Sequence, residues 1–262
     1  MIEKNIKIIA TDLDDTLLRR DKTISEYTKS VFAQCREKGI LIAFVTARTA
    51  MATERYRAQI LPDILISDTG ALVRHGSKAL YKAIIPDAEA LVLVQKCLEN
   101  PGILQITVQA ENGYFDSKPL DKTTPGWEDY ACKIETDFSR PIDYGEIYKV
   151  SVLTDGSKVA VDITKHFPKL VLTNYRNTNW YAFNSGNASK DRALAAVIDA
   201  LDITTKNVVA FGDDAIDAGM LRFAGRGVAV QNAVPEVKAV ADCICGDCDN
   251  DGVAKWIDEN IL

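Results

Sequence analysis

Three carboxylates stand close together near the start of the chain, directly after a short apolar run. The run is Ile6–Ala10, and the acids are Asp12, Asp14 and Asp15. Acids at positions i and i+2 of an extended chain point the same way, so Asp12 and Asp14 can act on one substrate. Burying carboxylates is costly unless a partner compensates their charge. A hard cation such as Mg²⁺, which takes oxygen ligands, is the expected partner.

Three later segments repeat this layout of an apolar strand or loop, a polar turn and a helix. Two of these turns follow the apolar runs Ile40–Val45 and Val208–Phe211. The third opens a helix predicted over Ser189–Leu201. In an open parallel sheet such turns all lie at the carboxyl edge, where ligands bind. The side chains that the four turns would bring together are Asp12, Asp14 and Thr16; Thr46 and Arg48; Lys190; and Asp213 and Asp217.

These groups together supply what phosphoryl transfer requires. One carboxylate can attack phosphorus and form an acyl phosphate. A second can protonate the leaving oxygen and later deprotonate water. A divalent cation, a lysine, a hydroxyl and helix N-terminal amides can balance the charge on the phosphoryl oxygens. Each motif alone is weak evidence. The order of the four motifs and their shared strand–turn–helix setting together favour phosphoryl transfer.

The elements that must position these residues are of two kinds. Residues 1–83 and 184–262 alternate strands with helices, and their unbroken apolar strands are typical of a parallel sheet covered on both faces. Residues 84–183 have a different pattern, with a hairpin signal at Asn112-Gly113. We predict an α/β fold, with a Rossmann-like parallel-sheet core domain and an inserted α+β cap domain over 84–183.

The expected elements follow from apolar periodicity and from turn residues. Further helices are expected over Ser25–Lys38, Thr49–Gln59, Asp87–Leu98, Ser157–His166, Ala215–Phe223 and Val234–Ala241, and from Gly252. Further strands are expected at Ile64–Ile66, Ile103–Gln109, Tyr148–Thr154, Leu170–Thr173, Trp180–Phe183 and Gly227–Val230.

The composition of the chain argues against some classes of binding partner. The chain has 262 residues, 47% of them hydrophobic, and a net charge of −6, which argues against nucleic-acid binding. No apolar run is long enough to span a bilayer, and no signal-peptide hydrophobic region precedes the first strand. We therefore expect a cytoplasmic protein without a membrane partner, whose six cysteines are reduced thiols.

Two metal-like patterns near the C-terminus are set aside. Cys243, Cys245 and Cys248 resemble part of a zinc site, but structural zinc takes four ligands and neither histidine is nearby in sequence. The acids from Asp247 to Asp258 imitate a calcium loop, but the twelfth position is Asp instead of the usual Glu.

Six segments carry a resemblance to a known family. The chain resembles the haloacid dehalogenase-like phosphatases of the Cof-type branch, which carry a large α/β cap between their second and third motifs. The segments are DLDDTLL (12–18), FVTAR (44–48), SKDRAL (189–194), FGDDAIDAGML (211–221), GVAVQNA (227–233) and DNDGVAKWI (249–257).

The resemblance implies a role for each candidate residue. Asp12 is the implied nucleophile, and Asp14 the implied general acid and base, whose backbone carbonyl also binds Mg²⁺. Asp217 would support the metal site through water or Lys190. The implied phosphate-binding residues are Thr46, Arg48 and Lys190, and the implied Mg²⁺ residues are Asp12, Asp14, Asp213 and Asp217.

The expected function is Mg²⁺-dependent hydrolysis of small phosphorylated metabolites, sugar phosphates first and phosphorylated cofactors second. A phosphosugar mutase is one alternative. A weakly active sensor of phosphorylated metabolites is another, because Ile216 stands where the family usually has Asn. Asp15 and Thr69 also depart from the family pattern, at positions where Gly and Asn are commoner.

Overall fold

The structure is a computed structural model that describes residues 5–123, 126–176 and 178–262. The chain divides into a core unit, residues 1–81 with 189–262, and an inserted unit, residues 82–188. The domain boundary expected at 183/184 falls inside strand β11 (Trp180–Ser185), which belongs wholly to the inserted unit. Residues 1–4 of the expected core range lie outside the described residues.

The core unit is built on an eight-stranded sheet in the order β14-β13-β12-β1-β2-β3-β4-β5. The strands from β14 to β3 run parallel, and β4 is antiparallel to β3. Strands β1 and β12 are buried along their whole length, as expected for a sheet covered on both faces. The strands are β1 Ile8–Thr11, β2 Leu41–Val45, β3 Ile64–Ser67, β4 Leu72–His75, β5 Lys78–Lys82, β12 Val208–Gly212, β13 Arg226–Ala229 and β14 Cys243–Ile244.

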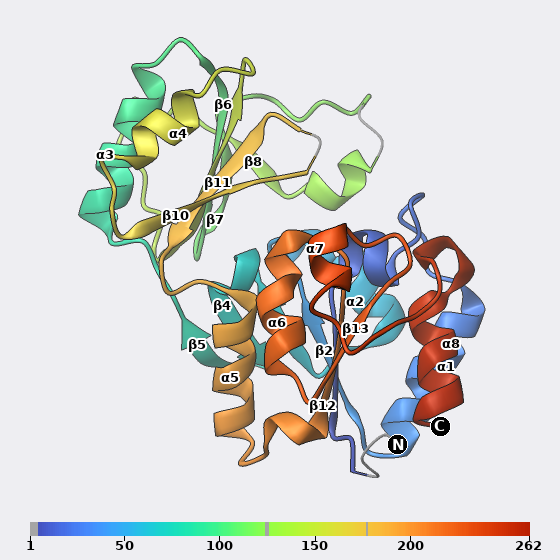
Figure 1. Ribbon diagram of the computed structural model, residues 1–262. Helices are drawn as coiled ribbons and strands as arrows, with labels where there is room; N and C mark the ends of the chain where they lie inside the picture. The colour runs from blue at the N-terminus through green and yellow to red at the C-terminus, as the bar shows by residue number, and fades with distance from the viewer. Residues whose placement is uncertain (1–4, 124–125, 177) are drawn as a thin grey trace. The chain divides into compact units, whose positions relative to one another are not determined.

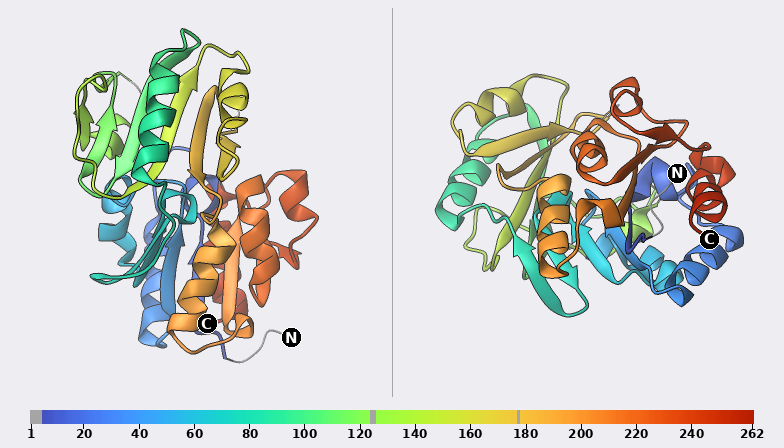
Figure 2. Two further views of the ribbon diagram at one scale, coloured as in Figure 1. Left: turned by 90° about the vertical axis from the view of Figure 1, so that its left-hand side faces the viewer. Right: turned by 60° about the horizontal axis from the view of Figure 1, so that its bottom comes forward.

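Two layers of helices sandwich this sheet (Figures 1 and 2). Helices α1 (Glu26–Glu37), α2 (Glu54–Ile60) and α8 (Gly252–Asn260) pack together on one face, while α5 (Lys190–Ala200) and α6 (Ala218–Phe223) pack together on the other. The short α7 (Pro235–Lys238) contacts α6. Among the described residues, no helix has the length and hydropathy needed to cross a bilayer.

The inserted unit has a six-stranded sheet in the order β10-β11-β9-β6-β7-β8. Helices α3 (Asp87–Leu98) and α4 (Val159–Thr164) pack on β6, β9 and β10 (Figure 1). Alternate strand residues such as Val108, Val150 and Phe183 form its apolar core. The strands are β6 Ile103–Ala110, β7 Gly113–Asp116, β8 Lys133–Glu135, β9 Ile147–Thr154, β10 Leu170–Asn174 and β11 Trp180–Ser185.

Most expected elements form, and the differences have local causes. The helix expected over Thr49–Gln59 opens with a 3₁₀ turn at Met51–Thr53 before α2 begins. The hairpin between β6 and β7 forms, but Ala110 pairs with Gly113, so Gly113 belongs to the strand and not to the turn. Strands β4, β5 and β8 were not expected, because they are short or, like β5, largely exposed and lack an apolar run.

Candidate active site

Strand β1 lies where the connections of the core sheet change direction. The chain passes from β1 to β2 on one side, while β12 pairs with β1 on the other. Ligands of open α/β sheets bind at the carboxyl ends of strands at such a point. Thr11 is level with both Phe44 and Phe211, so the residues that follow these three strands lie next to one another. This register brings the turns after Thr11, Val45 and Gly212 together.

Lys190 joins two of these turns. Its ammonium group donates a 2.7 Å hydrogen bond to Oδ1 of Asp12 and also bonds Oδ1 of Asp217. The lysine is 1% exposed and is the first residue of α5, after Ser189. Burial alone would lower the pKa of Lys190, but the charges of Asp12 and Asp217 raise that pKa above its usual value. Lys190 therefore stays a cation that holds the Asp12 carboxylate in place.

Asp217 organises the turn that follows β12. Its second oxygen accepts hydrogen bonds of 3.0 Å from the backbone N–H groups of Asp213 and Asp214. A Cβ atom at Gly212 would lie 2.5 Å from Cβ of Asp217, so this close approach requires glycine. Asp217 is fully buried, with both oxygens in hydrogen bonds. Its contacts are those of a residue that holds Lys190 and the Asp213 turn in position.

Asp12, Asp213 and Asp217 form the group that we call the buried acidic cluster. Each has a carboxylate oxygen within 4.8 Å of the other two. Asp213, which is 5% exposed, accepts a 2.8 Å hydrogen bond from the hydroxyl of Thr16. Burial and the neighbouring Asp217 charge raise the pKa of Asp213 to about 7, and burial also raises the pKa of Asp12. Burial and crowding disfavour the charged form of these carboxylates, a cost that a bound cation would offset, and their oxygen donors fit Mg²⁺.

The Asp14 carboxylate does not bind Lys190 but is paired with two other cations. Nε and Nη2 of Arg48 donate hydrogen bonds of 2.7 Å to its two oxygens, and the Lys22 ammonium group lies 3.0 Å from one of them. Burial alone would raise the pKa of Asp14, but Arg48 and then Lys22 lower it to about 2. Arg48 also stacks 5.1 Å from the centre of the Tyr56 ring. Arg48, which was expected to hold a phosphoryl group, thus binds the Asp14 carboxylate here.

Thr46 supports the turn after β2. It is 1% exposed, and its hydroxyl oxygen accepts a 3.1 Å hydrogen bond from the backbone N–H of Arg48. Its carbonyl oxygen accepts a 3.1 Å bond from the N–H of Thr69. The side chain of Thr46 therefore sets the backbone path that presents Arg48 to Asp14.

Sequence reasoning missed two residues beside this site. Lys22 was missed because a lysine in a turn is usually a surface residue, and nothing local marks its contact with Asp14. Asn232 was quoted inside a motif but given no role; it donates a 2.6 Å hydrogen bond to the carbonyl of Asp15 and accepts one of 3.0 Å from the N–H of Cys248. Asn232 thus ties the first motif to the loop that precedes α8. Asp15 itself has φ +57°, the left-handed conformation that explains why glycine is common there.

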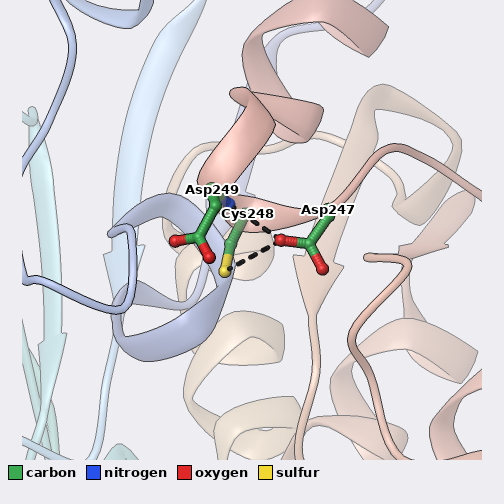
Figure 3. A group of neighbouring side chains, drawn as sticks. All are labelled: Asp247, Cys248 and Asp249. Carbon is green, nitrogen blue, oxygen red and sulfur yellow. Dashed lines mark hydrogen bonds between the residues drawn. The ribbon is translucent and has the colours of Figure 1, made fainter.

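A second acidic group lies in the loop before α8 (Figure 3). We call Asp247 and Asp249, with Cys248 between them, the loop acidic cluster. The Arg20 guanidinium bonds both carboxylates, at 3.0 Å to Oδ2 of Asp247 and closely to Asp249. The Cys248 sulfur lies 3.8 Å from Oδ1 of Asp247, and burial raises the pKa of its thiol to about 11. A neutral thiol and a paired arginine fit neither a zinc nor a calcium site.

Comparison with known proteins identifies the family. A profile of the haloacid dehalogenase-like hydrolases matches residues 9–257. The chain is 29% identical to the 5-amino-6-(5-phospho-D-ribitylamino)uracil phosphatase of Bacillus subtilis, over 98% of this chain and 97% of that protein. It is 28% identical to the pyridoxal phosphate phosphatase of Escherichia coli, over 98% of this chain and 99% of that protein.

A solved structure shares the fold of this chain. The crystal structure of a haloacid dehalogenase-like hydrolase from Bacteroides thetaiotaomicron superposes with a TM-score of 0.86, covering 97% of this chain and 99% of that one at 22% identity. The predicted resemblance and the predicted α/β fold class are both confirmed. This chain belongs to the haloacid dehalogenase-like hydrolases.

Proposed function

We propose that this chain is a Mg²⁺-dependent phosphatase that hydrolyses small phosphorylated metabolites through an aspartyl phosphate on Asp12. The observation that carries this proposal is the convergence of Asp12, Lys190 and Asp213 from distant segments on one edge of the sheet. The relatives named above act on phosphate esters of small molecules, which supports the same reaction class.

In the first step an oxygen of Asp12 attacks phosphorus, and the bond from phosphorus to the leaving oxygen breaks. Lys190 orients the attacking carboxylate through its bond to Oδ1 and offsets negative charge as the phosphoryl group arrives. The leaving oxygen takes a proton from Asp14. Bound Mg²⁺, held by oxygens of Asp12 and Asp213 and the carbonyl of Asp14, would supply charge that stabilises the phosphoryl oxygens.

In the second step water attacks phosphorus, Asp14 accepts the water proton, and the bond between phosphorus and Asp12 breaks to release phosphate. The ionised Asp14 found here, bonded to Arg48 and Lys22, is the form that this second step needs. The first step needs Asp14 protonated and released from Arg48. We propose that substrate phosphoryl oxygens replace Asp14 on Arg48, since both are anions that fit a guanidinium fork.

The relatives and the two-unit layout support the proposed substrate class. Sugar and polyol phosphates come first, and phosphorylated cofactors second, in line with the ribityl and pyridoxal compounds in the relatives' names. We propose that the inserted unit acts as the cap that selects the leaving group. Six free cysteines agree with action in the cytoplasm.

Hydrolysis of p-nitrophenyl phosphate, with Mg²⁺ and with the metal chelated, tests the proposal. We expect turnover with Mg²⁺ and its loss on chelation. Release of isomerised sugar phosphate instead of free phosphate from hexose 1-phosphates would replace the phosphatase with a mutase. Stoichiometric binding of phosphorylated ligands without phosphate release would replace it with a sensor, the alternative that Ile216 motivates.

A further inference from the structure

Two cations hold the Asp14 carboxylate, and they bind its two oxygens differently. Arg48 donates one 2.7 Å bond from Nε to Oδ2 and another from Nη2 to Oδ1. The Lys22 ammonium group lies 3.0 Å from Oδ1. When Arg48 turns to the phosphoryl oxygens of a substrate, as proposed above, Oδ2 loses its bond to Nε, whereas Oδ1 keeps its contact with Lys22.

This difference suits a group that moves protons. Oδ2 can give a proton to the leaving oxygen in the first step and take one from the attacking water in the second. The contact between Lys22 and Oδ1 can persist in both steps, because Oδ1 of a protonated carboxyl group is a carbonyl oxygen that still accepts hydrogen bonds. Lys22 can therefore orient Asp14 while Arg48 binds the phosphoryl group.

Lys22 lies on the open side of Asp14. The side chain of Lys22 is 32% exposed and that of Asp14 is 37% exposed, against 8% for Arg48. Arg48 stacks on the Tyr56 ring, and its Nη1 donates a 3.3 Å bond to the carbonyl of Ala52. Water and a leaving group can thus reach the Asp14 carboxylate while Lys22 stays in contact with it.

A second acid keeps Lys22 in place. Oδ1 of Asp15 accepts a 3.3 Å hydrogen bond from the Lys22 ammonium group. Asp15 stands where the family pattern favours glycine, and its φ of +57° is a conformation that suits glycine best. Because of Asp15, Lys22 keeps an anionic partner even when Asp14 carries a proton.

The backbone of Lys22 is held in a tight turn. Its φ of +62° is uncommon for residues other than glycine. The Lys22 N–H donates a 2.8 Å bond to the carbonyl of Arg19, and the Arg19 N–H donates a 3.1 Å bond to the carbonyl of Thr23. The Arg19 guanidinium is paired with Asp251 at 2.8 Å. Such conformations persist where surrounding bonds hold them, and they are frequent at active sites.

We propose that Lys22 is a positioning residue that holds Oδ1 of Asp14 through both chemical steps, so that Oδ2 faces first the leaving oxygen and then the attacking water. This inference rests on the proposed phosphatase function. It adds to that function a residue from outside the six segments that carry the family resemblance.

Two aryl esters of similar shape test this role, p-nitrophenyl phosphate and phenyl phosphate. The p-nitrophenolate ion leaves without a proton, whereas phenolate needs the proton of Asp14. Both esters form the same phosphoenzyme, whose hydrolysis needs Asp14 as the base. Loss of Lys22 should therefore slow the first step for phenyl phosphate alone and the second step for both esters.

The variants are Lys22→Met, Lys22→Arg and, as a matched control, Lys29→Met. Lys29 is also paired with an acid, Glu26 at 2.7 Å, and its side chain is 28% exposed. We expect Lys22→Met to lower kcat/KM, which covers the steps up to release of the leaving group, about 10-fold for phenyl phosphate and less than about 2-fold for p-nitrophenyl phosphate. Lys22→Arg should restore most of the loss, and the control should change neither value.

The second step has its own readout. With p-nitrophenyl phosphate, we expect kcat of Lys22→Met to fall about 10-fold and a stoichiometric burst of p-nitrophenolate to precede steady turnover, because the phosphoenzyme accumulates. Lys29→Met should show the burst of the wild type.

Equal losses of kcat/KM for the two esters, without accumulated phosphoenzyme, would assign Lys22 a structural role and overturn the inference. An active wild type whose kinetics Lys22→Met matches would overturn the inference alone. A wild type that hydrolyses neither ester would overturn the proposed function and this inference with it.

Discussion

The buried acidic cluster and the loop acidic cluster both bring carboxylates into close reach, yet their charges are balanced differently. In the buried cluster, one lysine faces Asp12 and Asp217, and burial raises the pKa of Asp213 to about 7. In the loop cluster, the Arg20 guanidinium bonds both acids and lowers the pKa of Asp247. A compact set of acids therefore indicates a metal site only where negative charge is left uncompensated.

The two clusters also differ in how they are assembled. Asp247 and Asp249 are neighbours in one turn, whereas Asp12 and Asp213 come from strands that pair across the sheet. Local clustering of acids occurs in any polar loop. Acids from distant segments that converge in a buried position pay a desolvation cost, which a bound cation can offset. The buried acidic cluster is therefore the expected Mg²⁺ site.

The largest effect should come from Asp12→Asn. The amide cannot attack phosphorus, so we expect kcat with p-nitrophenyl phosphate to fall at least about 10³-fold. The same substitution at Asp249 provides the matched control and should leave kcat within about 2-fold of the wild type. Comparable losses in both variants would erase the distinction between the clusters.

The next largest effect should come from Asp213→Asn, which should weaken the response of activity to Mg²⁺. Loss of one carboxylate from the metal site should raise the Mg²⁺ concentration for half-maximal activity at least about 10-fold. Titration of activity with Mg²⁺ measures this, with Asp249→Asn again as the control. A shift in the control instead would move the metal to the loop cluster.

Arg48→Gln should release Asp14 from its ion pair. The pKa of Asp14, about 2 beside Arg48 and Lys22, should then rise toward its usual value. Activity that depends on the ionised Asp14 should be lost at a higher pH than in the wild type, and kcat should fall about 10-fold. A pH–rate profile checks this, and Arg48→Lys should restore part of the wild-type profile. An unchanged acid limb would remove Arg48 from the mechanism.

The stability of the metal-free protein should depend on pH through Asp213. The unfolded chain releases this proton near its usual pKa of about 4, whereas the folded protein keeps it to about 7. The folded state binds more protons between these values, so its stability falls as the pH rises across this window. The gain in Tm on adding Mg²⁺ should therefore be larger at about pH 8 than at about pH 5.5. An equal gain at both values would place Mg²⁺ away from Asp213.

The smallest effect should come from Arg20→Ala. Its pairs with Asp247 and Asp249 are largely exposed, and such pairs contribute little to stability. We expect Tm to change by no more than about 2 °C and the Mg²⁺ response to stay the same. New Mg²⁺ binding by this variant, seen by calorimetry, would contradict this expectation and would show that Arg20 keeps the loop cluster from binding a metal ion.

Much of the site could be predicted because strand ends carry chemistry at a shared edge. The positions of Asp12, Lys190 and Asp213 follow from three strand–turn–helix patterns, and the structure brings these residues together. The partner of Arg48 could not be predicted. Sequence spacing predicts the backbone position of a residue, whereas tertiary packing determines which group its side chain contacts. The contact of Lys22 with Asp14 was missed for the same reason.

The strands also differ in whether the sequence pattern predicts them. Unbroken apolar runs predict buried strands such as β1 and β2, and the predicted ends of both strands lie within one or two residues of the observed ends. Strand β5 exposes several of its residues and lacks an apolar run, so its existence depends on pairing with a neighbour and not on local pattern. Thr69 at φ +63° is another tertiary effect, since β-branched residues rarely adopt this conformation unaided.

Trapping of the phosphoenzyme tests the central claim most directly. Enzyme mixed with a substrate labelled with ³²P in its phosphoryl group is quenched in acid within one turnover, digested, and the labelled peptide identified. The account predicts label on the peptide that contains Asp12 and none in Asp12→Asn. Phosphate release with no labelled protein at any quench time, or label that persists in Asp12→Asn, would contradict it.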